Sequence, residues 1–436
     1  MIIQPCDLNL CVLSRKCLIT AALLIISVTA HAIALEEAIE SAIKNDPSLR
    51  ASKLSKLAAE ENISIASSRL LPQITIQGSS NQLTQTTIQD LPTGGSASRS
   101  FSGPSINHQI VLRQGLIRPK EISSLRYAEL HTEYIGLKYK SELSDLRVKV
   151  ANAWIELISA HQIAQANERS LPYLETIAAQ ERNKYELGDG TKDAAIEAFA
   201  QYENAKTSHL LIIESLKFKK IAFEKLTRIS VDELHYGNFK VFNLVQIPEI
   251  EKTSVWEKIR DTSLEISMAR LQEKMQIERI QLALADHKPT LDFISAVNLA
   301  QNDATSTQGY QYKNKQIGLQ YSIPIYLGGG ISASVKQAKL GYEASIAETE
   351  AVNLKIENEF ESNWSQYISG QAKLKAFLSL LAAQVEVNKA INKSFELGYK
   401  TLADVAATEN LFSKREIDLI YQKQEFFKLM LRLKLI

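Results

Sequence analysis

The sequence predicts a mainly α-helical protein that also contains a few β-strands, with the whole pattern repeated once along the chain. Three observations support this prediction. Two long stretches read as helix, four shorter stretches of about ten residues alternate apolar and polar side chains, and the second half restates the first at a displacement of about 210 residues. A length of 436 residues would permit several compact domains, yet no linker rich in proline, glycine and serine divides the chain.

The N-terminal segment 1–32 has the pattern of a secretory signal peptide, and we expect cleavage after Ala32. Arg15 and Lys16 precede an apolar run at 18–28, and a small-residue triplet at 30–32 follows. The run is about eleven residues long, whereas a membrane-spanning helix needs roughly 20, so a signal peptide explains the segment better than a membrane anchor does.

Composition argues against several functional classes. The three cysteines, Cys6, Cys11 and Cys17, lie in the signal segment, so the exported chain would carry no disulfide. The segment also accounts for the whole-chain net charge of +1, and the resulting neutral chain argues against nucleic-acid binding. The seven histidines lack metal-ligand spacing, and no phosphate loop or hydrolase motif is present. We therefore predict no enzyme activity, no cofactor and no metal.

Short motifs recur in the same order in the two halves and indicate an internal repeat. We assign the first repeat to 33–230, a connecting segment to 231–250 and the second repeat to 251–436. The predicted order in each is helix, strand, polar loop, strand, long helix, glycine turn and helix. The matched motifs are Leu71-Pro72 with Lys288-Pro289, residues 110–115 with 323–328, and residues 185–188 with 395–398.

The predicted strands are about 72–83, 105–113, 290–300 and 315–326, with polar loops at 94–102 and 301–308 between the members of each pair. Alternation is clearest in the second pair, where apolar side chains share one face of each strand and polar side chains share the other. The apolar residues are Leu291, Phe293, Val297 and Leu299 in one strand and Ile317, Leu319, Tyr321 and Ile323 in the next.

The segment 331–397 contains no proline and predicts one helix of about 67 residues, or roughly 100 Å at 1.5 Å per residue. The matching segment at about 116–187 predicts a second long helix that Pro172 bends. Pro324 and the glycines at 328–330 predict that the last strand turns sharply into the helix. Gly188 and Gly398 each predict a left-handed turn into a partner helix.

Four strands are too few to enclose a membrane barrel, which needs at least about eight. Because open sheet edges are not tolerated in lipid, a membrane location would require several copies to pool their strands. An ordinary soluble sheet remains open on the alternation alone, since this signal is weak for each segment.

The motifs in this order resemble the TolC family of outer-membrane factors. The residues that carry the resemblance are Leu71-Pro72, the string Lys288-Pro-Thr-Leu291, the string Ser322-Ile-Pro-Ile-Tyr-Leu-Gly-Gly-Gly330, the paired Leu-Gly turns and Asp404-Val405. The resemblance implies a homotrimer in which the strands form a twelve-stranded transmembrane β-barrel and the helices continue as a long periplasmic α-helical coiled-coil barrel. It covers nearly the whole exported chain, from about Leu35 onward.

The implied function is a passive exit duct in the outer membrane. An inner-membrane ABC or proton-driven pump and a periplasmic adaptor would dock on it, and drugs or secreted proteins would leave through it. Efflux and type I secretion share every motif discussed here, so the sequence does not identify the cargo. The alternative function is a secreted coiled-coil scaffold or adhesin without a pore.

The resemblance also implies roles for the two glycine turns and the residues around them. The predicted adaptor-contact tips are Leu187, Gly188 and Asp189 in the first turn and Leu397, Gly398 and Tyr399 in the second. The predicted periplasmic aperture and closing latch consist of Asp404, Lys400, Asp193 and Phe395. Asp404 has a second interpretation as a helix cap, because Thr401-Leu-Ala-Asp404 fits the capping-box pattern.

Overall fold

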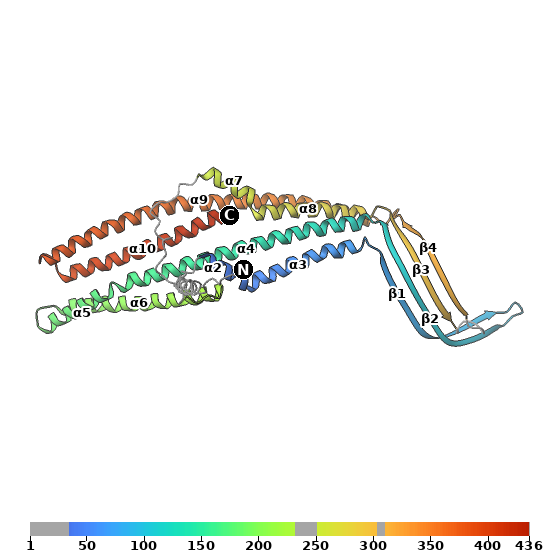
Figure 1. Ribbon diagram of the computed structural model, residues 1–436, viewed down its shortest axis with the longest axis horizontal. Helices are drawn as coiled ribbons and strands as arrows, with labels where there is room; N and C mark the ends of the chain where they lie inside the picture. The colour runs from blue at the N-terminus through green and yellow to red at the C-terminus, as the bar shows by residue number, and fades with distance from the viewer. Residues whose placement is uncertain (1–34, 232–250, 303–309, 436) are drawn as a thin grey trace, which may run out of the picture. The chain divides into compact units, whose positions relative to one another are not determined.

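The computed structural model describes residues 35–231, 251–302 and 310–435 (Figure 1). The predicted signal segment 1–32 and nearly all of the predicted connecting segment 231–250 lie outside the described residues. The chain forms two compact units, and each draws on both halves of the sequence. We call the unit containing 149–231 and 370–428 the hairpin unit, and the unit containing 46–148 and 251–369 the sheet unit.

The structure is mainly α-helical with an antiparallel sheet, as the sequence predicted. The first half contains α2 (Leu35–Asn45), α3 (Pro47–Ser68), β1 (Gln73–Asp90), β2 (Ser96–Ile117), α4 (Pro119–Glu168), α5 (Leu171–Glu186) and α6 (Lys192–Thr227). The second half contains α7 (Lys252–Thr262), α8 (Leu264–Ala285), β3 (Thr290–Asn302), β4 (Tyr310–Ser322), α9 (Gly330–Glu396) and α10 (Leu402–Leu435).

The first two strands are longer than predicted, and of the predicted loop at 94–102 only residues 94 and 95 lie in the turn, because 96–102 belong to β2. Gly94 and Gly95 have positive φ angles of 83° and 99° and turn the chain tightly between β1 and β2. The residues on either side continue the ladder, in which hydroxyls of Thr84 and Thr86 bond hydroxyls of β2 at 2.9 and 3.0 Å. The segment is rich in serine and threonine, which are common in loops, but here their side chains form hydrogen bonds across the strands. The composition alone therefore predicted a loop.

The fourth strand begins at Tyr310 and ends at Ser322, so the predicted end at residue 326 is wrong. Pro324 has no backbone N–H and cannot continue the ladder. Gly328 and Gly329 then adopt left-handed φ angles of 62° and 81° before α9 begins, as the predicted sharp turn requires. The predicted loop 301–308 lies almost entirely outside the described residues.

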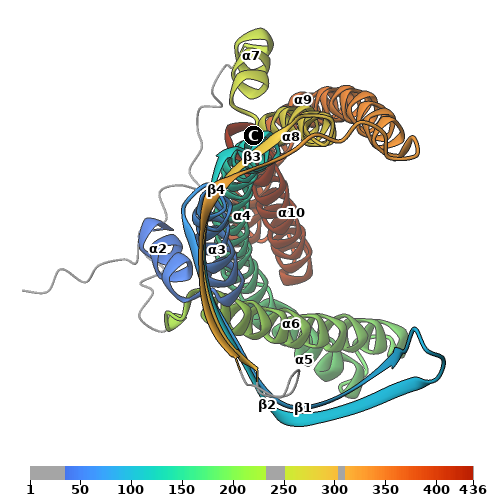
Figure 2. The same ribbon diagram turned by 90° about the vertical axis from the view of Figure 1, so that its right-hand side faces the viewer.

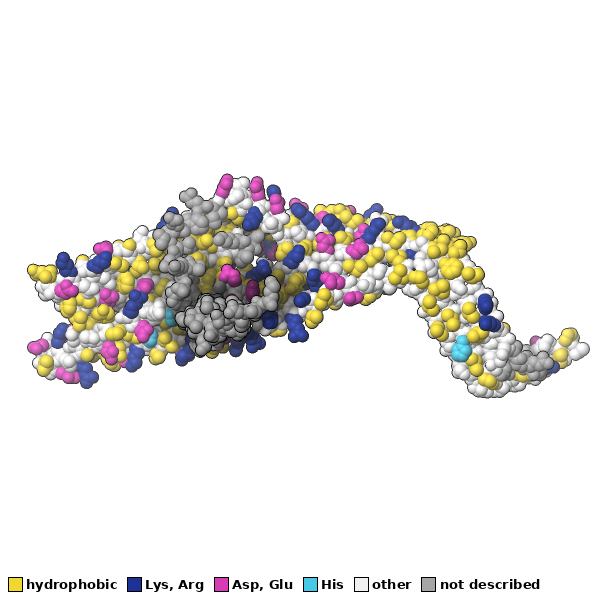
Figure 3. All heavy atoms as spheres, in the orientation of Figure 1, with side chains coloured by type: hydrophobic (Ala, Val, Ile, Leu, Met, Phe, Trp, Pro, Cys, Tyr) yellow, Lys and Arg dark blue, Asp and Glu magenta, His cyan; other side chains and the backbone are white. Residues whose placement is uncertain are grey.

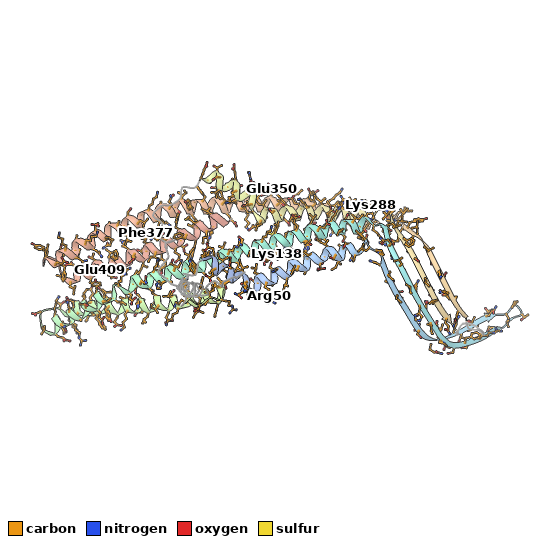
Figure 4. The ribbon with its side chains drawn as sticks, viewed as in Figure 1. Arg50, Lys138, Lys288, Glu350, Phe377 and Glu409 are labelled. Carbon is orange, nitrogen blue, oxygen red and sulfur yellow. The ribbon has the colours of Figure 1, made fainter. Side chains whose placement is uncertain are left out.

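The helix predicted at 331–397 is confirmed as α9, a single helix of 67 residues. The helix predicted at 116–187 is interrupted, since α4 ends at Glu168 and α5 begins at Leu171. Pro172 explains the break because its ring would clash with the carbonyl group four residues earlier, at Glu168. Lys288 follows α8 and directly precedes Pro289 and β3 (Figure 4).

The four strands form one sheet in the order β1-β2-β3-β4, and every neighbouring pair is antiparallel. Figure 2 shows this sheet bending along its strands. Aromatic side chains anchor α7 against α9 in the same unit. Trp256 and Phe360 have ring centroids 5.2 Å apart, and Trp364 continues the row 6.1 Å from Phe360.

The described helices contain no stretch long and apolar enough to cross a membrane.

Candidate functional site

The two predicted adaptor-contact tips are helix reversals of the same geometry, and both belong to the hairpin unit. In the first, the N–H of Gly188 donates to the carbonyl of Tyr185 at 3.1 Å, and the N–H of Asp189 donates to the carbonyl of Lys184 at 2.9 Å. This pair of bonds is the Schellman motif, which ends a helix at a left-handed residue. Gly188 provides that residue, with φ of +84°.

The second reversal repeats these bonds between α9 and α10. The N–H of Gly398 donates to the carbonyl of Phe395 at 2.9 Å, and the N–H of Tyr399 donates to the carbonyl of Ser394 at 2.9 Å. Gly398 has φ of +76°. The helix-stop role predicted for both glycines is confirmed. Phe377 on α9 and Glu409 on α10 mark the two helices of this reversal in Figure 4.

The tips present apolar side chains to the surroundings. Leu187 is 78% exposed, Leu397 is 62% exposed and Tyr399 is 81% exposed. Phe395 is 41% exposed and lies at the end of α9. These exposed side chains, clustered at the two helix reversals, are available for a partner protein to cover. Their role as adaptor contacts stays a prediction.

Asp404 forms the capping box that the sequence pattern allowed. Its backbone N–H donates to the hydroxyl of Thr401 at 3.2 Å, and its carboxylate accepts from the N–H and the hydroxyl of Thr401, both at 2.9 Å. These backbone and side-chain bonds from Thr401, together with the nearby charge of Lys400, lower the pKa of Asp404 below its usual value of 3.8. The group is therefore ionised at neutral pH.

Lys400 pairs with Asp404 within its own copy, at 3.5 Å between Nζ and Oδ1. Asp193 lies in the first turn of α6 behind the N-cap residue Thr191, whose hydroxyl accepts from the N–H of Ala194 at 3.3 Å. The described residues contain no ion pair between Lys400 and Asp193. Neither the closing latch nor the aperture ring is tested by a single copy, and both stay predictions.

Three helices of the hairpin unit share one carboxylate that the sequence reasoning missed. Glu156 on α4 accepts from Lys219 on α6 at 2.7 Å and from Lys428 on α10 at 3.0 Å. Burial acts to raise the pKa of Glu156, but the bonds from the two lysines outweigh it and lower the pKa below 4.5. Long-range pairing of this kind leaves no spacing pattern in the sequence.

A partly buried ion pair in the sheet unit joins the two halves of the chain where the strands meet the helices. Arg118, between β2 and α4, donates from Nε to Oδ1 of Asp292 at 2.7 Å and from Nη2 to Oδ2 at 2.5 Å. Asp292 on β3 is only 7% exposed. Gly115 leaves room for this pair, because a Cβ there would lie 2.7 Å from Cγ of Arg118.

The strand register gathers the apolar residues of all four strands on one face of the sheet. Ile76 pairs with Ile110, Ile110 pairs with Val297, and Phe293 pairs with Leu319. Because side chains alternate along a strand, these paired residues point to the same side. In Figure 3 hydrophobic side chains gather on the part of the sheet next to the helices, and the part farther from the helices is mainly white, the colour of uncharged polar side chains and backbone. We call the side of the sheet that carries the paired apolar residues the apolar face.

The opposite face of the same strands is rich in amide side chains. Gln77 pairs with Gln109, Gln109 pairs with Asn298, and Asn298 pairs with Asn314. The two outer strands, β1 and β4, have no further strand beside them among the described residues. The sheet therefore offers one apolar face, one polar face and two open edges.

Comparison with known proteins agrees with this geometry. The model of the outer membrane efflux protein family matches residues 38–227 and 255–426. The outer membrane protein TolC of Vibrio cholerae is 24% identical over 90% of this chain and 88% of its own length. The protease secretion protein PrtF of Dickeya chrysanthemi is 22% identical over 96% of this chain and 91% of its own length.

A solved structure extends the likeness to the fold. The CmeC outer membrane channel of Campylobacter jejuni superposes with a TM-score of 0.75 at 14% sequence identity. The superposition covers 92% of this chain and 84% of that one.

Proposed function

The chain belongs to the outer membrane efflux protein family, and from that premise we propose that it is a passive exit duct for tripartite efflux or type I secretion. As a member of this family it is an outer-membrane transport protein. A periplasmic adaptor and an inner-membrane pump would deliver the cargo, and drugs or secreted proteins would leave through the duct. Nothing in the comparisons favours the secreted scaffold or adhesin.

The observation that carries this proposal is the two-faced sheet with open edges. An apolar face on one side and an amide-rich face on the other suit strands that separate lipid from a hydrated lumen. Unpaired edges are not stable in lipid, so each β1 edge would pair with the β4 edge of the next copy. Three copies would supply twelve strands to a barrel, which is the assembly that the family resemblance implies.

Two aspects of the chain support the internal repeat. Each half runs through two helices, two strands and then long helices in the same order. In both halves, the helix before the glycine turn also ends with the same pair of backbone hydrogen bonds. We therefore retain 33–230 and 251–436 as the two repeats, and the signal peptide at 1–32 stays a prediction from the sequence.

The tip residues support docking of an adaptor. Leu187 and Leu397 are exposed on rigid turns, so little ordering would be needed for a partner to bury them. We assign Gly188, Asp189, Gly398 and Tyr399 to the same contact because they form the turns themselves.

Asp404 would serve two roles in the assembled duct. It caps α10 in each copy, and three copies would place a ring of ionised carboxylates at the periplasmic aperture. Lys400, Asp193 and Phe395 would form the closing latch between neighbouring helices. Exchange of Lys400 from its own Asp404 to a neighbour would be the step that couples the ring to the latch.

Disulfide trapping between copies tests the assembly directly, because the exported chain has no natural cysteine after residue 17. Thr75 on β1 would be changed to cysteine and combined in turn with cysteine at Gln316, Gly318 or Gln320 on β4. One of these pairs should give a cross-linked trimer under oxidation, because all four positions lie on the polar face.

The matched control places the second cysteine at Gln109 on β2, an inner strand that no neighbouring copy can reach. It should remain a monomer on a denaturing gel. A protein that stays monomeric in every β1–β4 combination, and that gives no ion current in a planar bilayer, would overturn the proposed function.

A further inference from the structure

Two lysines lie on the apolar face, in the half of β4 that is farther from the helices. Lys315 pairs with Val297, and Lys313 pairs with Leu299. Both lysines have the same parity along β4 as Ile317, so their side chains point to the apolar face and not to the amide-rich face. The register of β3 and β4 contains no bulge that would change this assignment.

The two lysines are exposed and have no ion pair within the described residues. The described sheet contains two carboxylates, Asp90 and Asp292. Asp90 lies at the end of the β1–β2 hairpin, and Asp292 points to the opposite face, where two arginines neutralise it. Asp90 is twelve residues along β1 from Gly78, which shares a rung with Lys313, so no carboxylate of the described sheet lies near the two lysines on their own face.

The other end of the apolar face has different chemistry. Tyr321 pairs with Leu291 next to the helices and is 74% exposed. Tyrosine suits a membrane interface because one end of its ring is apolar and the other polar. Along β4, the apolar face thus carries an aromatic side chain near the helix end and two cations farther from the helices.

We propose that Lys313 and Lys315 bind the phosphate groups of a phosphorylated glycolipid in the outer leaflet of the outer membrane. The inference rests on the proposed function, since helices in the periplasm place the half of β4 that carries the lysines toward the outer leaflet. The lysines stand two residues apart, about 6.8 Å along the strand, and flexible side chains of that spacing can contact one phosphate together.

A lipid phosphate fits this surface better than a free phosphate ion does. Ile317 and Leu319 lie directly beside the lysines and are 74% and 63% exposed, so acyl chains can cover them while the phosphate meets the ammonium groups. Inorganic phosphate would gain only the charge contact, which salt screens strongly on an exposed surface.

The test measures lipid binding by the assembled full-length mature protein in nanodiscs. The probes are bisphosphorylated lipid A and the same lipid with both phosphates removed, titrated against wild type and the Lys313→Gln/Lys315→Gln variant. We expect about fivefold weaker binding of the phosphorylated lipid for each lysine lost, or about 25-fold for both. Binding of the dephosphorylated lipid should not change.

The control variant is Lys373→Gln/Lys375→Gln, which removes two exposed lysines from α9 and so makes the same change in charge away from the sheet. It should bind both lipids as wild type does. Equal binding of the two lipids by wild type, equal losses in both variants, or full displacement by inorganic phosphate at the same concentration would each overturn the inference. Bilayer conductance separates the two hypotheses, because wild type that conducts but shows no lipid preference refutes only the lipid site.

Discussion

Removal of the Asp292 carboxylate should destabilise the junction between strands and helices by about 2 kcal/mol. Breaking a buried ion pair by removing one partner costs about 3–5 kcal/mol, because the remaining charge is left unpaired. The Arg118 side chain is 25% exposed, and the Glu121 carboxylate stays 3.5 Å from its Nη1 atom. Because solvent and Glu121 would still partly neutralise Arg118, we expect a smaller cost of about 2 kcal/mol. Asp292→Asn is the appropriate change because its shape is nearly the same.

The assay is urea unfolding of the protein in detergent, followed by the fluorescence of its three tryptophans. Asp292→Asn, Arg118→Met and the double variant form a double-mutant cycle, which isolates the energy of the pair. Gly115→Ala should give a similar loss, because its Cβ would displace the Arg118 side chain. Its effect should not add to that of Arg118→Met.

A matched cycle on an exposed pair supplies the control. Lys252 and Glu361 are joined at 2.7 Å, but their side chains are 45% and 54% exposed. Their coupling should be below about 0.5 kcal/mol, because solvent already neutralises both charges. If the Arg118–Asp292 coupling energy is no larger than that of the control pair, burial does not strengthen the ion pair at the junction and the reasoning is wrong.

Three further predictions concern the hairpin unit. The pKa of Asp404 is lowered in the folded protein, so its cap should stabilise α10 above pH 3.8 and be lost as the pH falls through the lower folded pKa. Amide hydrogen exchange at the second glycine turn should therefore speed up at low pH. Exchange at the first turn, where Ala194 occupies the equivalent position, should not change in this way. Gly398→Ala should lower the thermal midpoint, because alanine at a positive φ angle costs about 1 kcal/mol. No atom lies within 4 Å of the new Cβ, so a steric clash adds nothing to this cost. The control, Gly136→Ala in the interior of α4, should raise the midpoint. Glu156→Gln should cost about 1 kcal/mol in urea unfolding above pH 4.5 and progressively less below it, where the wild-type carboxylate also becomes neutral; a constant difference down to pH 3 would contradict this.

Local patterns in the sequence were sufficient to predict α9, the two glycine turns and the faces of the second pair of strands. A proline-free stretch of 67 residues predicted α9 to within one residue at each end, because a continuous helix needs only local hydrogen bonds. Gly188 and Gly398 were recognisable because a left-handed helix end strongly favours glycine. Strand ends were predicted less well, since Thr84 and Ser102 bond across strands and yet have the composition of a loop.

The tertiary structure alone decided which charges meet. Arg118 and Asp292 are 174 residues apart, and Glu156 and Lys428 are 272 apart, so no spacing rule connects them. The strand register likewise fixed which strand faces form one surface, and so placed Lys313 and Lys315 on the apolar face. Sequence periodicity defines the faces of one element, whereas contacts between distant elements depend on the free energy of packing the whole chain.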